Sequence, residues 1–127
     1  MSHSAHHINS PEELQSLLSS TTYVVVDFFA DWCPPCKAIA PIFEQLAGKH
    51  TQPKYLAFAK VNVDKVDGLA ATYQITAMPT FMFFKEGKQV AVNGQSLLRG
   101  AEVVPCQVPE HLLQCLRPTR AETLYPR

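Results

Sequence analysis

The hydrophobic pattern of the chain centres on residues 23–29, YVVVDFF, where every position except Asp27 is apolar. β-Branched and aromatic side chains dominate this stretch, which is typical of a strand that is buried on both faces of a sheet. An isolated carboxylate in such a strand is unfavourable unless it has a partner or a chemical task. The pattern therefore predicts a central strand and marks Asp27 as a candidate functional residue.

Before this strand, the pattern predicts a short strand at residues 6–9 and then a helix. Residues 10–13, Ser-Pro-Glu-Glu, have the sequence of a capping box with proline at the first helical position. The helix is expected to end near Ser19. Its apolar face consists of Leu14, Leu17 and Leu18.

After the central strand, a longer helix is expected from Pro34 to about Lys49. A kink is expected at Pro41, because an internal proline removes one helical hydrogen bond. Gly48 and the segment 51–53 are expected to end this helix. Its buried face consists of Ile39, Phe43, Leu46 and Ala47.

Residues 56–63 alternate in the manner of a strand, and one face of it carries Leu56, Phe58, Lys60 and Asn62. Lys60 is thus expected to point inward beside Phe58. Two interpretations of this lysine remain open. It is either an edge lysine whose stem is buried while its amine reaches water, or it is the partner of Asp27.

Shorter elements follow: a helix around Leu69, strands at 80–84 and from Val90 onward, and a turn at 85–88 between them. The dipeptide at 93–94, Asn-Gly, is a strong hairpin signal. The last strand therefore either carries a bulge or continues into an extra short hairpin, which we favour. The alternating order of strands and helices predicts an α/β sheet.

Composition and charge exclude several function classes. The chain has 127 residues, which suits one domain, and its formal net charge is zero. Bulk electrostatics therefore gives no reason to expect a nucleic-acid or membrane-surface partner. No apolar run has transmembrane length, and residues 1–10 lack the basic and apolar regions of a signal peptide, so a cytoplasmic or nuclear location is expected.

The strongest chemical signal is the pair Cys33 and Cys36, which two prolines separate at the junction of the central strand and the long helix. This spacing brings the two sulfurs close enough for a disulfide. Unpaired N–H groups at the helix N-terminus stabilise a thiolate, so the pKa of Cys33 is expected to lie below that of a free thiol. Cys33 is also expected to be the more exposed of the two.

The neighbouring residues should shape this pair of thiols. Pro34 and Pro35 fit the first helical turn and stiffen the loop between the sulfurs. Lys37 adds positive charge nearby. Trp32 offers a large apolar surface beside the thiol.

Other roles for the cysteines also have to be weighed. A Cys-x-x-Cys pair can be half of a zinc site, but Cys106 and Cys115 do not have the spacing of a second ligand pair. We therefore predict no bound metal. Cys115 is either a small core residue and Cys106 an inert loop thiol, or they take part in a regulatory or intermolecular disulfide.

The segment VDFFADWCPPCKAIAP resembles the active-site segment of thioredoxins, and the resemblance extends over roughly residues 5–101. That family usually has glycine where this chain has Pro34. The resemblance implies a thioredoxin fold, in which helices flank a central mixed β-sheet, and the activity of a protein-disulfide reductase. Three alternatives remain: a redox-coupled peptide-binding module, a thioredoxin-like domain of a larger protein, and an oxidase or isomerase of the secretory pathway.

The resemblance also implies roles for individual residues. Cys33 would be the nucleophile and Cys36 the resolving cysteine, and the two would form a disulfide when oxidised. Asp27, its pKa raised by burial, would accept the proton of Cys36. Lys60 would tune Asp27.

For substrate binding, the resemblance implies that an extended peptide docks on Trp32, Met78, Pro79 and Gly100, with Pro79 in the cis form. No cofactor is expected to be bound, and electrons would come from NADPH through a thioredoxin reductase. The expected partners are that reductase and disulfide-containing proteins. A monomer is expected, with a dimer as the alternative.

The C-terminal segment departs from the family, because Pro105 and Pro109 prevent one regular helix from running through both. A later helix is expected to start at Pro109. Its apolar face consists of Leu112, Leu113 and Leu116. We therefore expect a thioredoxin-like domain over residues 1–117 and a flexible tail over residues 118–127.

Overall fold

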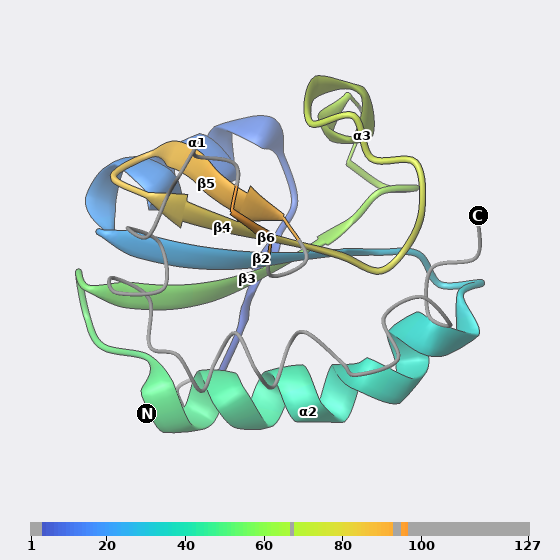
Figure 1. Cartoon of the computed structure of the whole chain (residues 1–127), viewed down its shortest axis with the longest axis horizontal. Coiled ribbons are helices and arrows are strands. Elements are labelled where there is room, and N and C mark those ends of the chain that lie inside the picture. Colours follow the sequence, from blue (N-terminus) through green and yellow to red (C-terminus); the bar gives the residue numbers. More distant parts are fainter. Residues whose placement is uncertain (1–3, 67, 93–94, 97–127) are drawn as a thin grey trace.

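A mixed β-sheet forms the centre of the molecule (Figure 1). The computed structural model describes residues 4–66, 68–92 and 95–96. Its sheet has six strands in the order β1-β3-β2-β4-β5-β6. In chain order, the strands are β1 (His6–Ile8), β2 (Tyr23–Phe29), β3 (Leu56–Asn62), β4 (Thr80–Lys85), β5 (Lys88–Val92) and β6 (Gln95–Ser96).

Strand β2 lies in the middle because it pairs with parallel β3 on one side and antiparallel β4 on the other. Its bounds and its burial agree with the predicted central strand, since only Phe29 is partly exposed. Helix α2 (Pro34–His50) covers one face of the sheet, while α1 (Pro11–Ser20) and α3 (Leu69–Thr72) lie on the other (Figure 1). The predicted order of strands and helices is thus confirmed.

Helix α1 begins at the predicted N-cap Ser10, but the return bond from Glu13 goes to Asn9 and not to the N-cap itself. The backbone N–H of Glu13 donates to Ser10 Oγ at 3.2 Å. In return, Glu13 Oε1 accepts from the backbone N–H of Asn9 at 2.7 Å. The first bond satisfies a donor that the start of a helix would otherwise leave unpaired, and the second holds the residue before the N-cap, so the entry into α1 is fixed locally.

Helix α2 starts at Pro34 with Cys33 as its N-cap and continues through Pro41 to His50. Figure 1 shows that its first turns are tilted against the rest of the helix, which fits an internal proline. The predicted end near Lys49 is confirmed, although the helix runs through Gly48 and it is the segment from Thr51 that ends it. Thr51 ends it, since its backbone N–H and its hydroxyl both donate to the carbonyl oxygen of Ala47.

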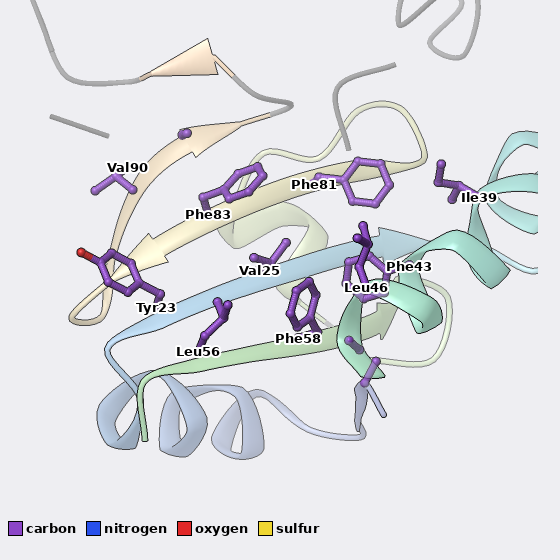
Figure 2. Close-up of a cluster of buried hydrophobic side chains, with 13 residues drawn as sticks. Tyr23, Val25, Ile39, Phe43, Leu46, Leu56, Phe58, Phe81, Phe83 and Val90 are labelled. Atoms are coloured by element: carbon purple, nitrogen blue, oxygen red, sulfur yellow. The ribbon is translucent and has the colours of Figure 1, made fainter. Parts of the chain in front are cut away.

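Side chains of β2 alternate between two hydrophobic clusters. Tyr23 and Val25 face α2, as Figure 2 shows, and Val24, Val26 and Phe28 face the other helices. In the α2 cluster, the ring of Phe43 lies edge-on to Phe58 at 5.5 Å and stacks on Phe81 at 6.0 Å. By the same alternation, Asp27 belongs to the α2 face of the sheet.

The second half of the sheet is a meander. A turn at Glu86 and Gly87, both with positive φ, joins β4 to β5. The pairing of these strands shifts register between Phe83 and Phe84, and β6 then pairs antiparallel with β5. Both of the predicted alternatives are therefore present: an irregularity in the pairing of β4 with β5, and an extra antiparallel pair formed by β5 and β6. The predicted helix from Pro109, both distal cysteines and the tail 118–127 lie outside the described residues.

The packing of α2 predicts how two adjacent residues differ in their contribution to stability. Phe43 is fully buried, whereas Ile42 is 42% exposed. Phe43→Ala should lower the free energy of unfolding by roughly 3–5 kcal/mol, because it removes a core ring and leaves a cavity. The matched change Ile42→Ala should cost less than about 1 kcal/mol. Urea titrations followed by circular dichroism measure both, and equal losses would contradict the assignment of the buried face.

Candidate active site

Cys33 and Cys36 form a disulfide at the N-terminus of α2. Their Cα atoms are 5.2 Å apart, within the range that a disulfide spans without moving the backbone. The backbone N–H of Cys36 donates to Cys33 Sγ at 3.1 Å, so Cys33 is the capping residue of the helix. An N–H of the first helical turn, which has no backbone acceptor within the helix, thus points at Cys33 Sγ. This favours negative charge on that sulfur.

The predicted difference in exposure between the two cysteines is wrong. Cys33 is 2% exposed and Cys36 is 3% exposed. They pack with Ala30, and partly buried side chains that include Met78 lie against this small cluster. The two sulfurs are therefore distinguished by the field of the helix and not by access to water.

A segment far along the chain completes the rim of the site. The carbonyl oxygen of Met78 lies 3.5 Å from Cys33 Sγ, and the Met78–Pro79 peptide bond is cis, as the resemblance implies. On the other side, Trp32 is 65% exposed and its indole N–H donates to Asp64 Oδ2 at 2.9 Å. Gly100, the remaining predicted substrate-binding residue, lies outside the described residues.

Asp27 is 1% exposed, and its Oδ1 atom has no hydrogen-bond partner among the described residues. Burial raises the pKa of Asp27 to about 7, because the charged carboxylate loses its hydration. The positive charge of Lys60 lowers this pKa, and the negative charge of Glu44 raises it. The group is thus poised to gain or lose a proton near neutral pH.

Lys60 lies directly opposite Asp27 in the register of β2 and β3, and it is buried as predicted. Its ammonium nitrogen lies 3.9 Å from Glu44 Oε2 on α2 and 4.9 Å from the centre of the Phe29 ring. The sequence analysis missed Glu44. Its local sequence gives no signal, because a charged residue on a helix is usually a solvated surface group.

Comparisons with known proteins agree with this geometry. The sequence profile described as Thioredoxin matches residues 5–100. The chain belongs to the thioredoxin family. It is 75% identical over 97 residues to a "Thioredoxin-like protein" of Fusarium culmorum, covering 76% of this chain and 80% of that one. It is 57% identical over 103 residues to a "Thioredoxin" of Neurospora crassa, covering 81% of each chain.

Solved structures show the same relationship. A thioredoxin of Plasmodium falciparum superposes with a TM-score of 0.67 at 35% identity, covering 88% of this chain and 96% of that chain. The protein therefore has the thioredoxin fold. It is a thioredoxin-type protein-disulfide oxidoreductase with reductase activity, and Cys33 and Cys36 are its active-site pair.

Two further structural facts concern metal ions and membranes. Among the described residues, no group of three or more side chains is arranged to hold a metal ion. Within that same part of the chain, no helix is long and apolar enough to span a bilayer.

The buried carboxyl group predicts how stability depends on pH. Because its folded pKa lies above its ordinary value of 3.8, the folded state holds more protons between pH 3.8 and about 7. Stability should therefore fall as the pH rises through this window. Asp27→Asn removes this pH-dependent loss of stability, so the free energy of unfolding of the oxidised variant should be higher at pH 7 by on the order of 4 kcal/mol. The difference should vanish near pH 4, where the wild-type carboxyl group is protonated.

Urea titrations of the oxidised proteins at several pH values measure this difference. Asp31→Asn is the matched control, because Asp31 is an exposed carboxylate close to the same helix terminus. It should leave the pH dependence of the wild type unchanged. If Asp27→Asn is no more stable than the wild type at pH 7, the carboxyl group is not buried as described.

Proposed function

We propose that the two active-site sulfurs have fixed and unequal roles. The Cys33 thiolate attacks one sulfur of a partner disulfide, forms a mixed disulfide and releases the other partner sulfur as a thiolate, which takes up a proton. Cys36 then loses its proton and attacks Cys33 Sγ, which expels the first partner sulfur. The partner gains two electrons and the Cys33–Cys36 disulfide forms. The single observation that carries this assignment is the bond from the Cys36 amide to Cys33 Sγ, because it stabilises a thiolate at Cys33 alone.

Asp27 is proposed as the acceptor of the Cys36 proton. Its pKa of about 7 suits a group that must take up a proton at neutral pH and release it afterwards. It lies on the α2 face of the sheet, the face that also receives the helix carrying Cys36. Lys60 is proposed to tune Asp27, because its charge opposes the effect of burial.

The residues around the sulfurs are proposed to shape and bind the substrate. Trp32 offers an exposed ring, and the Met78 carbonyl next to Cys33 is placed to pair with an extended peptide, with cis Pro79 fixing the turn. Gly100 is proposed to complete this surface. Pro34 and Pro35 stiffen the first turn of α2.

Lys37 is exposed in the first turn of α2, and we propose that its charge adds to the positive potential of the helix N-terminus. The partners of the reaction follow from the family. Electrons are proposed to come from NADPH through a thioredoxin reductase, and the substrates are disulfide-containing proteins. The protein is proposed to act as a monomer in a reducing compartment, the cytosol or the nucleus, because reducing systems there regenerate its dithiol.

The unequal roles predict different behaviour of two single variants. Cys36→Ser should attack a substrate disulfide but fail to resolve, so the substrate should stay covalently attached to Cys33. Cys33→Ser should capture nothing. Non-reducing gels after incubation with insulin measure the adduct, and dithiothreitol should release it.

The double variant Cys33→Ser/Cys36→Ser gives the background level of capture. Capture by Cys33→Ser in place of Cys36→Ser would reverse the order of attack. No capture by either variant above that background would mean that the pair does not attack disulfides. Consumption of NADPH by the wild type with a purified thioredoxin reductase and insulin tests the electron source separately.

A further inference from the structure

Two carboxyl groups, those of Asp27 and Glu44, are candidate partners for the ammonium group of Lys60. Lys60 lies directly opposite Asp27 in the strand register, and both side chains point to the α2 face of the sheet. Its ion pair is nevertheless with Glu44 Oε2, at 3.9 Å. Asp27 Oδ1 is left without a hydrogen-bond partner among the described residues. The fold therefore holds the Lys60 ammonium group toward α2 and away from the Asp27 carboxyl group.

Glu44 is itself held in place by the start of the chain. Its Oε1 atom accepts a hydrogen bond from the backbone N–H of Ala5 at 3.2 Å, and its Oε2 atom lies 3.8 Å from His7 Nε2. Its side chain is 36% exposed, while the side chain of Lys60 is 10% exposed. Glu44 thus connects the edge strand β1 to the buried lysine and is not a freely moving surface carboxylate.

We propose that Glu44 is a positioning residue of the redox site, which holds the Lys60 ammonium away from Asp27 and so keeps Asp27 able to carry a proton. The ring of Phe29, 4.9 Å from the same nitrogen, also attracts the ammonium group in this position. Without Glu44, Asp27 is the buried carboxyl group that lies directly opposite this cation in the strand register. An ion pair there would favour the charged form of Asp27 and weaken it as a proton acceptor.

The charged and titratable groups that surround Glu44 come from three strands: His7 on β1, Asp27 on β2 and Lys60 on β3. Asp31 and Lys65 line the same pocket as His7 and Lys60. This inference rests on the proposed role of Asp27, and its test separates the two.

The first measurement is the pKa of Asp27 in the oxidised protein, from the ¹³C chemical shift of its carboxyl carbon. Glu44→Gln keeps an oxygen that accepts from the Ala5 amide and removes only the charge. We expect the pKa of Asp27 to fall by about 1, the lower end of the effect of a close opposite charge. Glu12→Gln, the same change on the exposed start of α1, should leave that pKa unchanged. No fall in Glu44→Gln overturns the inference.

The second measurement separates positioning from direct repulsion. Glu44 also acts on Asp27 through its own negative charge, and that effect persists without Lys60. In a Lys60→Met background, which keeps the apolar stem, Glu44→Gln should therefore shift the Asp27 pKa by less than half as much. An equal fall in both backgrounds overturns the inference. Lys60→Gln serves as the background if Lys60→Met does not fold.

The third measurement is the pH profile of the resolving step, followed as release of a thiol from a preformed mixed disulfide with Cys33. If Asp27 accepts the proton, the midpoint of this profile should move down in Glu44→Gln by the same amount as the Asp27 pKa. If the pKa falls and the profile does not move, Glu44 positions Lys60 as inferred, and the proposed role of Asp27 is wrong. A profile that moves without a change in the Asp27 pKa overturns the inference about Glu44.

Discussion

Burial of the Asp27 carboxyl group inside the central strand is the constraint on which the arrangement of the active site depends. A carboxylate removed from water is unfavourable unless it is protonated or paired. Here the group is almost completely buried and its pKa is raised to about 7, so it is held between these two states. After burial, the charges that act on this balance are those of Lys60 on the next strand, β3, and of Glu44 on α2.

The position of β2 explains why a single residue can have this influence. Strand β2 pairs with parallel β3 and antiparallel β4, so both of its edges and both of its faces are covered. Its C-terminal end leads directly to Cys33 and the start of α2. Any group on its α2 face is therefore rigidly placed relative to the helix that carries the two sulfurs.

Much of this fold could be predicted from local patterns. The bounds of β2 and the buried face of α2 follow from runs and spacings within a few residues, because burial of a strand or helix face leaves a short-range signature. The pair Cys33 and Cys36 is recognisable for the same reason, since both sulfurs lie in one turn.

The features that could not be predicted depend on contacts between distant segments. Cys33 is buried because Met78, 45 residues away, lies against it, and no local pattern contains that contact. Glu44 was missed because its importance comes from the Ala5 amide, 39 residues before it, and from Lys60 on another element. A charged residue on a helix is usually a solvated surface group, so the sequence alone gives no reason to single it out.

The exposed indole of Trp32 has a practical consequence for spectroscopy. The chain contains one tryptophan, and it lies at the rim of the redox site with its N–H bound to Asp64. All intrinsic tryptophan fluorescence of the protein therefore comes from a ring that adjoins the reactive sulfurs. Its emission should therefore change when the disulfide forms and, under the substrate-binding role proposed for Trp32, when a peptide docks, so no label is needed to follow either event.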